Sequence, residues 1–131
     1  MVDREADIRG PQRKILAASV RPMRAAFGTS GIRLRNGRTL PFIVQREWSA
    51  PAGHYAETWY LVHPETREVY FEGPIRQARV IGLQAATEFA DEVVQPIELT
   101  PGTYHVVFAL GGQMGGQMDV EVSDPGAEEA A

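Results

Sequence analysis

The sequence contains no cysteine and no long apolar run, and only three of its 131 residues are histidine. The absence of cysteine excludes disulfides, thiolate metal sites and a cysteine nucleophile. The longest apolar run, residues 106–110, is far shorter than the roughly 20 residues that a membrane-spanning helix needs. The first ten residues carry three acids and lack the apolar core of a signal peptide, so we expect no transmembrane segment and a cytoplasmic protein.

The composition is that of one ordinary soluble domain, with 44% apolar and 23% charged residues. A chain of this length buries roughly two-thirds of the surface that its unfolded form exposes, which is enough for one hydrophobic core. The length leaves no room for a second full domain.

Charge is divided unevenly along the chain. Residues 1–46 carry ten Lys or Arg against three acids, a net charge of +7, whereas residues 47–131 carry three Arg against fourteen acids, a net charge of −11. A basic segment of this kind indicates a nucleic acid, an anionic membrane surface or an acidic protein as partner. Neutralisation of the chain's own acidic body, or of a sister subunit's, is an equally good explanation.

Residues 11–27 are expected to form a basic amphipathic helix, kinked or broken near Pro22. Four apolar residues recur at spacings of four, three and four: Leu16, Val20, Met23 and Phe27. Four basic residues lie away from this stripe: Arg13, Lys14, Arg21 and Arg24. We interpret residues 1–38 as an arm that uses these eight residues to dock on a partner, with packing on the chain's own body as the alternative.

From residue 32 onward apolar and polar residues alternate, which predicts strands. Asn36-Gly37 predicts a hairpin. A two-residue loop would pair Leu34 with Thr39 and put the apolar sets on opposite faces, so we favour a longer loop that places Leu34 opposite Leu40. Residues 54–63 have apolar side chains at both odd and even positions, which is typical of a central strand that is covered on both faces. Trp59 is the expected core anchor of this strand.

Residues 75–95 fit helix and strand patterns equally well. We expect a strand near 77–83, a short helical or irregular piece near 85–91 and a strand near 93–99. A strand with Tyr104, Val106 and Phe108 on its buried face comes next, then a glycine-rich loop over GGQMGGQM (residues 111–118) and a last strand. Residues 39–123 then form the body, and residues 124–131 an acidic tail.

The segment Leu99-Thr100-Pro101-Gly102-Thr103-Tyr104 resembles the tyrosine corner of immunoglobulin-like and fibronectin-type domains, in which the tyrosine hydroxyl bonds back to nearby backbone. The resemblance implies a mainly β fold: a single immunoglobulin-like antiparallel β-sandwich, here with a basic N-terminal helical arm. The chain departs from immunoglobulins proper because it lacks both core cysteines, so Trp59 has no disulfide to pack on. Such a fold hosts many unrelated functions.

One group of residues could bind a metal. His105, Met114 and Met118 combine an imidazole with two thioethers, a set of ligands that selects copper(I). Met118 also shares the parity of Val120 and Val122, which favours a place in the core. The acids have no spacing that nominates an acid/base pair, the serines lack a nucleophile elbow, and no glycine-rich loop carries the lysine of a phosphate site, so no cofactor is expected.

The leading prediction is therefore a non-catalytic structural or accessory subunit that docks on a partner protein or assembly, or on sister chains of a homo-oligomer, through its N-terminal arm. The alternatives are a small-ligand or copper carrier, and a small hydrolase or isomerase whose acid/base residues are far apart in sequence. Nucleic acid is an unlikely partner, because Phe27 is the arm's only aromatic residue and the acidic body repels phosphate. Peripheral contact with a membrane stays open.

Overall fold

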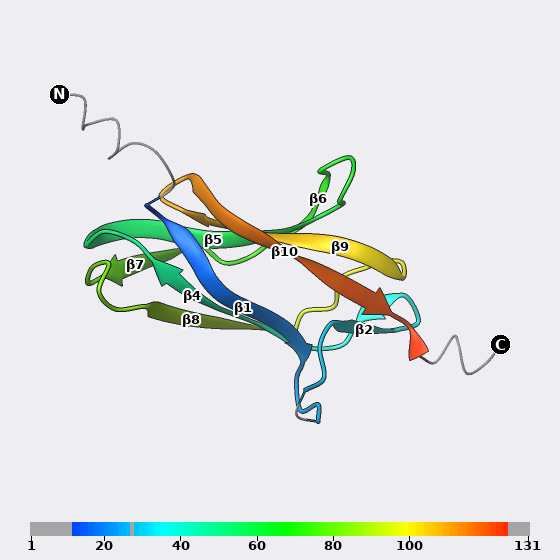
Figure 1. Ribbon diagram of the computed structural model, residues 1–131. Helices are drawn as coiled ribbons and strands as arrows, with labels where there is room; N and C mark the ends of the chain where they lie inside the picture. Colours follow the sequence, from blue (N-terminus) through cyan, green and yellow to red (C-terminus); the bar gives the residue numbers. More distant parts are fainter. Residues whose placement is uncertain (1–11, 27, 126–131) are drawn as a thin grey trace.

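The computed structural model describes residues 12–26 and 28–125, which form ten β-strands (Figure 1). The fold is therefore mainly β, as the alternation of apolar and polar residues predicts. The strands are β1 (Lys14–Pro22), β2 (Ile32–Arg35), β3 (Arg38–Thr39), β4 (Phe42–Ser49), β5 (Gly53–Val62), β6 (Val69–Glu72), β7 (Arg76–Val80), β8 (Thr87–Val93), β9 (Gly102–Leu110) and β10 (Gln113–Ser123).

The strands form two sheets. One has the order β1-β4-β8, and the other has the order β3-β2-β10-β9-β5-β6 with β7 also paired to β5. All neighbours are antiparallel except β2 and β10, which run parallel, with Ile32 beside Val122. β5 is a central strand, as predicted, because it pairs with β9 on one side and with β6 and β7 on the other.

The N-terminal helix is not seen, and this prediction is wrong. Residues 14–22 form β1, which runs antiparallel to β4 with Val20 opposite Val44. The register of β1 shifts between Ile15 and Ala17, so the side-chain parity changes there. The apolar stripe predicted for the helix is therefore not one buried face: Leu16 is exposed, Val20 lies in the core beside Ile15, and Met23 lies beyond the end of β1.

The hairpin prediction also needs correction. Asn36 and Gly37, with φ of 55° and 76°, form a two-residue turn that pairs Leu34 with Thr39. Both central residues of this turn have positive φ, as the type I′ turn requires. The apolar residues before and after the turn need not share one face of one sheet, because the chain leaves the larger sheet after β3 and starts β4 in the other sheet.

Two further segments differ from their predictions. Residues 85–91, expected to be helical or irregular, lie mostly in β8, and the strand expected at 93–99 is absent apart from β8's last residue and one isolated bridge at Glu98. In the expected 111–118 loop, only Gly111 and Gly112 form a turn, and the rest belongs to β10. Gly115 is needed in that strand because a Cβ there would overlap the Trp48 ring.

Buried side chains from both sheets form one hydrophobic cluster. Trp48 and Trp59 are fully buried in it, which confirms Trp59 as a core anchor, and Tyr104, Val106 and Phe108 share the buried face of β9 as predicted. Gly73 packs on Trp59 as Gly115 does on Trp48, since a Cβ at position 73 would overlap the indole.

A network of buried charges joins the two sheets inside this cluster. Arg46 of β4 donates to both carboxylate oxygens of Glu57 on β5, at 2.8 and 2.5 Å, and its Nη1 lies 3.0 Å from Oδ2 of Asp91 on β8. Arg76 of β7 donates to Oδ1 of Asp91. Two cations therefore balance two carboxylates between the sheets.

The two tryptophans complete this network. Trp48 Nε1 donates to Glu57 Oε2 at 2.9 Å, and Trp59 Nε1 donates to Asp91 Oδ2 at 2.8 Å. A buried polar group without a hydrogen-bond partner is costly. In each of these two pairs the carboxylate supplies the acceptor that the buried indole N–H needs. We refer to Arg46, Glu57, Arg76 and Asp91 as the buried charge network, in which only Arg76 reaches the surface, with 36% of its side chain exposed.

Candidate functional site

Four arginines gather where the loop after β1, strand β2 and the β2–β3 hairpin meet. All four side chains are exposed, and none has a hydrogen-bond or ion-pair partner in the part of the chain that the structure describes. We call them the arginine end: Arg24, Arg33, Arg35 and Arg38. Their exposure leaves the whole positive charge of each guanidinium open to an external anion.

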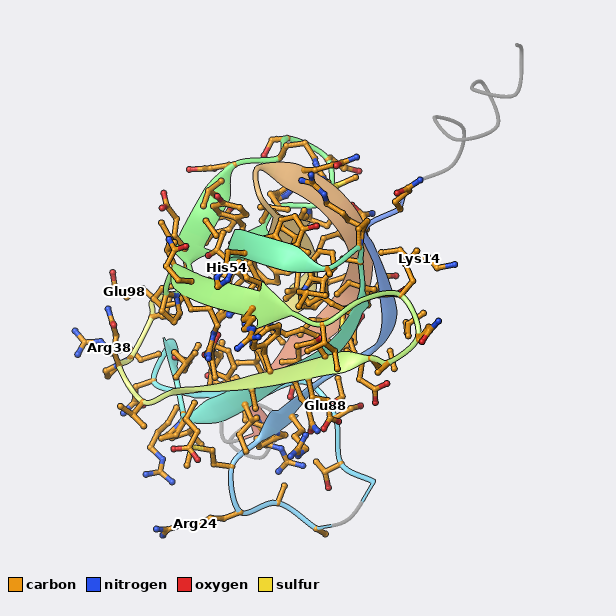
Figure 2. The ribbon with its side chains drawn as sticks, turned by 90° about the vertical axis from the view of Figure 1, so that its left-hand side faces the viewer. Lys14, Arg24, Arg38, His54, Glu88 and Glu98 are labelled. Carbon is orange, nitrogen blue, oxygen red and sulfur yellow. The ribbon has the colours of Figure 1, made fainter. Side chains whose placement is uncertain are left out.

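The β2–β3 hairpin places like charges directly opposite each other. Arg35 pairs with Arg38 across the turn, and Arg33 lies two residues before Arg35 on the same face of β2. Directly opposed like charges destabilise a strand pair. Glu98 bridges Arg38 through the backbone and lies beside it in Figure 2 without forming an ion pair.

Two grooves open between these arginines. The larger one, about 720 Å³, has Arg24 and Arg33 at its rim and an apolar lining that includes Met23, Leu40 and Val94. Val94 is 64% exposed, so this part of the apolar lining is open to solvent.

The smaller groove, about 470 Å³, is lined by Arg35, Arg38 and Pro96, and it shares Leu40 with the larger groove. Positive charge and apolar surface are thus interleaved over this end of the molecule.

The structure divides the eight residues predicted to dock on a partner. Met23 and Arg24 line the larger groove. Lys14 and Leu16 are exposed near the start of β1, and Figure 2 shows Lys14 and Arg24 far apart. Phe27 lies outside the described residues. The predicted residues therefore do not form a single face.

Three of the eight are engaged within the chain itself. Arg13 donates from Nη1 to the Leu110 carbonyl at 3.1 Å and stacks over the Tyr55 ring. Arg21 donates to Gln45 Oε1 at 2.8 Å. Val20 is 1% exposed and belongs to the core.

Sequence reasoning missed Arg33, Arg35 and Arg38. Their signal was present in the sequence as IRLRNGR, where a two-residue Asn-Gly turn puts all three arginines on one face. The prediction of a longer loop placed Arg38 on the opposite face from Arg33 and Arg35, because one added residue moves the following side chains to the other side of the hairpin.

The three predicted copper ligands are not brought together. His105 Nε2 lies 3.0 Å from Asp119 Oδ1, and its Nδ1 lies 3.0 Å from Arg67 Nη1, so protein groups occupy both ring nitrogens. Met118 packs against the core, on the other face of the sheet from His105. Met114 pairs with Ala109, four residues along β9 from His105.

The described residues contain neither a metal-binding cluster nor a membrane-spanning helix. Within residues 12–26 and 28–125, no group of three or more His, Asp or Glu side chains is arranged to hold a metal ion. The same residues contain no helix that is long and apolar enough to span a membrane.

Comparison with known proteins bears on the fold alone. No family model matches the chain, and no curated protein matches it. One solved structure that it resembles is the Pseudomonas fluorescens alkylpurine DNA glycosylase AlkC bound to DNA containing an abasic-site analogue, with a TM-score of 0.50 and 13% identity. The match covers 86% of this chain and 31% of that chain, so this chain spans less than a third of the glycosylase's length.

Proposed function

We propose that this chain is a non-catalytic accessory module, folded as an immunoglobulin-like β-sandwich, that docks through its arginine end on an acidic segment of a partner protein. The single observation that carries the proposal is the arginine end itself: four exposed guanidinium groups that have no partner among the described residues, two of them directly opposed. An external anion would relieve this repulsion. The proposed place of action is the cytoplasm.

The immunoglobulin-like part of the proposal has support from the tyrosine corner. Tyr104 donates from its hydroxyl to the Thr100 carbonyl at 2.8 Å, and the Thr100 N–H donates to that hydroxyl at 3.2 Å. This is the return bond that the Leu99–Tyr104 motif implies. Two sheets that share one core, with Trp59 on a central strand, agree with the same architecture.

An acidic protein segment suits the larger groove better than a bare polyanion. Arg24 and Arg33 would pair with carboxylates at the rim, where each exposed ion pair contributes only about 0.2–1 kcal/mol. An apolar side chain seated against Met23, Leu40 and Val94 would contribute about 1.5–3 kcal/mol if fully buried. The apolar anchor thus carries the affinity, and the arginines select the charge of the partner.

A nucleic acid is the second candidate partner, for one specific reason. One solved structure with a similar fold is a glycosylase bound to DNA. Guanidinium groups bind phosphate as readily as carboxylate. On this alternative Val94 would have no role, because phosphate contacts do not use an apolar anchor.

The proposal is tested with point variants. Deleting residues 1–30 would remove β1 and Val20 from the core and unfold the protein, so it is not a usable test. R35E is preferable, because a glutamate opposite Arg38 forms a favourable cross-strand pair and preserves the hairpin. K14E is the matched control, since it makes the same change of charge on an exposed residue far from the arginine end.

The measurement is native mass spectrometry of complexes isolated gently from the host, followed by titration of the purified partner. We expect R35E to weaken the complex by about two- to fivefold, which corresponds to the loss of one exposed ion pair of about 0.2–1 kcal/mol, and K14E to leave it unchanged. Equal binding by wild type and R35E would overturn the proposal.

V94S separates the two partner classes. We expect this variant to weaken binding of an acidic partner protein and to leave binding of a 20-base-pair DNA duplex unchanged. If wild type binds the duplex with the salt dependence of several phosphate contacts, and R35E abolishes this binding while V94S does not, the nucleic-acid alternative replaces the protein one.

A further inference from the structure

The strand β7 leaves one of its edges open. It pairs with β5 and with no other described strand, from Arg76 opposite Glu57 to Val80 opposite Gly53. Figure 2 views the molecule from this side, where β7 lies in front beside the labelled His54. An open edge presents unpaired N–H and C=O groups that can pair with another strand.

Two isoleucines flank this edge. Ile75 comes directly before β7 and is 68% exposed, and Ile81 comes directly after it and is 69% exposed. They share the parity of Gln77 and Arg79, so all four belong to the outer face, opposite Ala78 and Val80 in the core.

The segment is self-complementary. If two copies of β7 pair antiparallel about a twofold axis at Ala78, Ile75 of each copy faces Ile81 of the other. Arg79 then faces Gln77, and Arg76 faces Val80, so no two arginines are directly opposed. The outer face of the joined sheets would carry two Ile–Ile pairs and two Arg–Gln pairs, which are favourable or neutral cross-strand neighbours.

Another edge strand, β8, is protected against such pairing. It carries Glu88 and Glu92 on its outer face and Asp91 on its inner face. Charged side chains on an edge, including inward-pointing ones, are the usual protection against strand addition. β7 also carries two charges, Arg76 on its inner face and Arg79 on its outer face, but Arg76 is already paired with Asp91 and neither arginine faces a like charge in the register above.

We propose that a second copy of this chain docks on the free edge of β7, in the antiparallel register centred on Ala78, and joins the two larger sheets into one. The interface is isologous, as a twofold symmetric dimer requires. It is separate from the arginine end, because β7 belongs to the opposite edge of the larger sheet from β2 and β3.

Disulfide cross-linking tests the register directly, because the natural chain contains no cysteine. Mixing the single variants I75C and I81C under mild oxidation should give a covalent dimer, since directly opposite residues in an antiparallel pair have nearby Cβ atoms. Each variant alone should not cross-link. Ile75 and Ile81 of one chain are about 20 Å apart along an extended strand, too far for a disulfide within one copy or between like positions.

Charge exchange provides the second test, by sedimentation velocity of the full chain over a range of concentrations. We expect the wild type to dimerise. The double variant I75K/I81K should raise the dimer dissociation constant at least tenfold. The double variant I75K/I81E should dimerise as the wild type does, because the lysine at position 75 then faces the glutamate at position 81 of the other copy. L83K is the control, because Leu83 is also well exposed, at 58%, but lies outside the register.

Two results would overturn the inference. One is a wild type that sediments as a monomer at every concentration, and the other is a dimer that neither cross-links in the I75C and I81C mixture nor responds to I75K/I81K. These outcomes are independent of the proposed docking function, since R35E should leave dimerisation unchanged and I75K/I81K should leave partner binding unchanged.

Discussion

Two groups of arginines in this protein differ in whether a carboxylate lies within reach. Arg46 and Arg76 lie between the sheets and pair with Glu57 and Asp91. The four arginines of the arginine end are exposed and have no partner within the described chain. The same side chain therefore stabilises the fold in one region and remains available for binding in the other.

The difference follows from desolvation. The buried Arg46 guanidinium loses its water, and the close carboxylates of Glu57 and Asp91, together with the Val44 carbonyl, offset that cost. An exposed guanidinium keeps its water, so it needs no partner to be tolerated. Changes in the buried charge network should therefore affect folding, whereas changes at the arginine end should affect association.

The largest expected effect comes from breaking the buried charge network. Glu57→Leu leaves Arg46 and the Trp48 N–H without their main acceptor in a site that is 0% exposed. Removing one partner of a buried ion pair costs about 3–5 kcal/mol. Urea unfolding measures the loss directly.

Glu98→Gln is the matched control for this substitution, since Glu98 is exposed and its side chain makes no ion pair. We expect it to change the free energy of unfolding by less than about 0.5 kcal/mol. A loss of under 1 kcal/mol in Glu57→Leu would contradict the view that the network holds the two sheets together.

The next largest effect concerns the glycine that packs on Trp48. In Gly115→Ala the new methyl group overlaps the indole ring, so the ring or β10 must move. Overpacking of this kind costs about 1–3 kcal/mol, measured as a lower urea midpoint. Gly53→Ala is the control, because its Cβ would meet only the Tyr55 ring at 3.4 Å, an ordinary contact distance. Equal stability of the two variants would show that Trp48 is loosely packed.

The alternation of apolar and polar residues was enough to predict the mainly β fold, the central place of Trp59 and the buried face of β9. These features depend on local patterns, which a single sequence carries. The helix at 11–27 was predicted wrongly because the bulge at Leu16 changes the parity of β1, and a bulge is visible only when the strand lies against its partner.

The candidate site was harder to predict for a different reason. The arginine end depends on which face each arginine occupies, and that depends on the length of the turn at Asn36-Gly37. The apolar part of the larger groove joins Met23 to Val94, 71 residues away in sequence. No local pattern indicates such a contact, nor the meeting of Arg46 with Asp91 in the buried charge network.

Salt should separate the two groups of arginines. Added NaCl screens exposed charges over about 10 Å at 0.1 M, but it affects buried pairs much less. We therefore expect the affinity for the docking partner to fall as salt rises from 0.05 to 0.5 M, while the loss of stability in Glu57→Leu stays nearly constant. Titration calorimetry and urea unfolding in the same buffers test both. Partner binding that is insensitive to salt would argue that the groove's apolar lining acts without the arginines.

The smallest expected effect is a gain of stability at the arginine end. In Arg38→Gln the charge opposite Arg35 disappears while the backbone pairing of the hairpin remains. Cross-strand pairs of this kind contribute about 0.2–1 kcal/mol, so the urea midpoint should rise slightly. Because the repulsion is screened by salt, the gain should be larger at 0.02 M than at 0.5 M NaCl. Lys14→Gln removes a charge from an exposed residue that is not opposed by another cation, and it should show no such dependence. A loss of stability in Arg38→Gln would mean that this side chain already holds part of the fold, and the arginine end would then be structural, like the buried charge network.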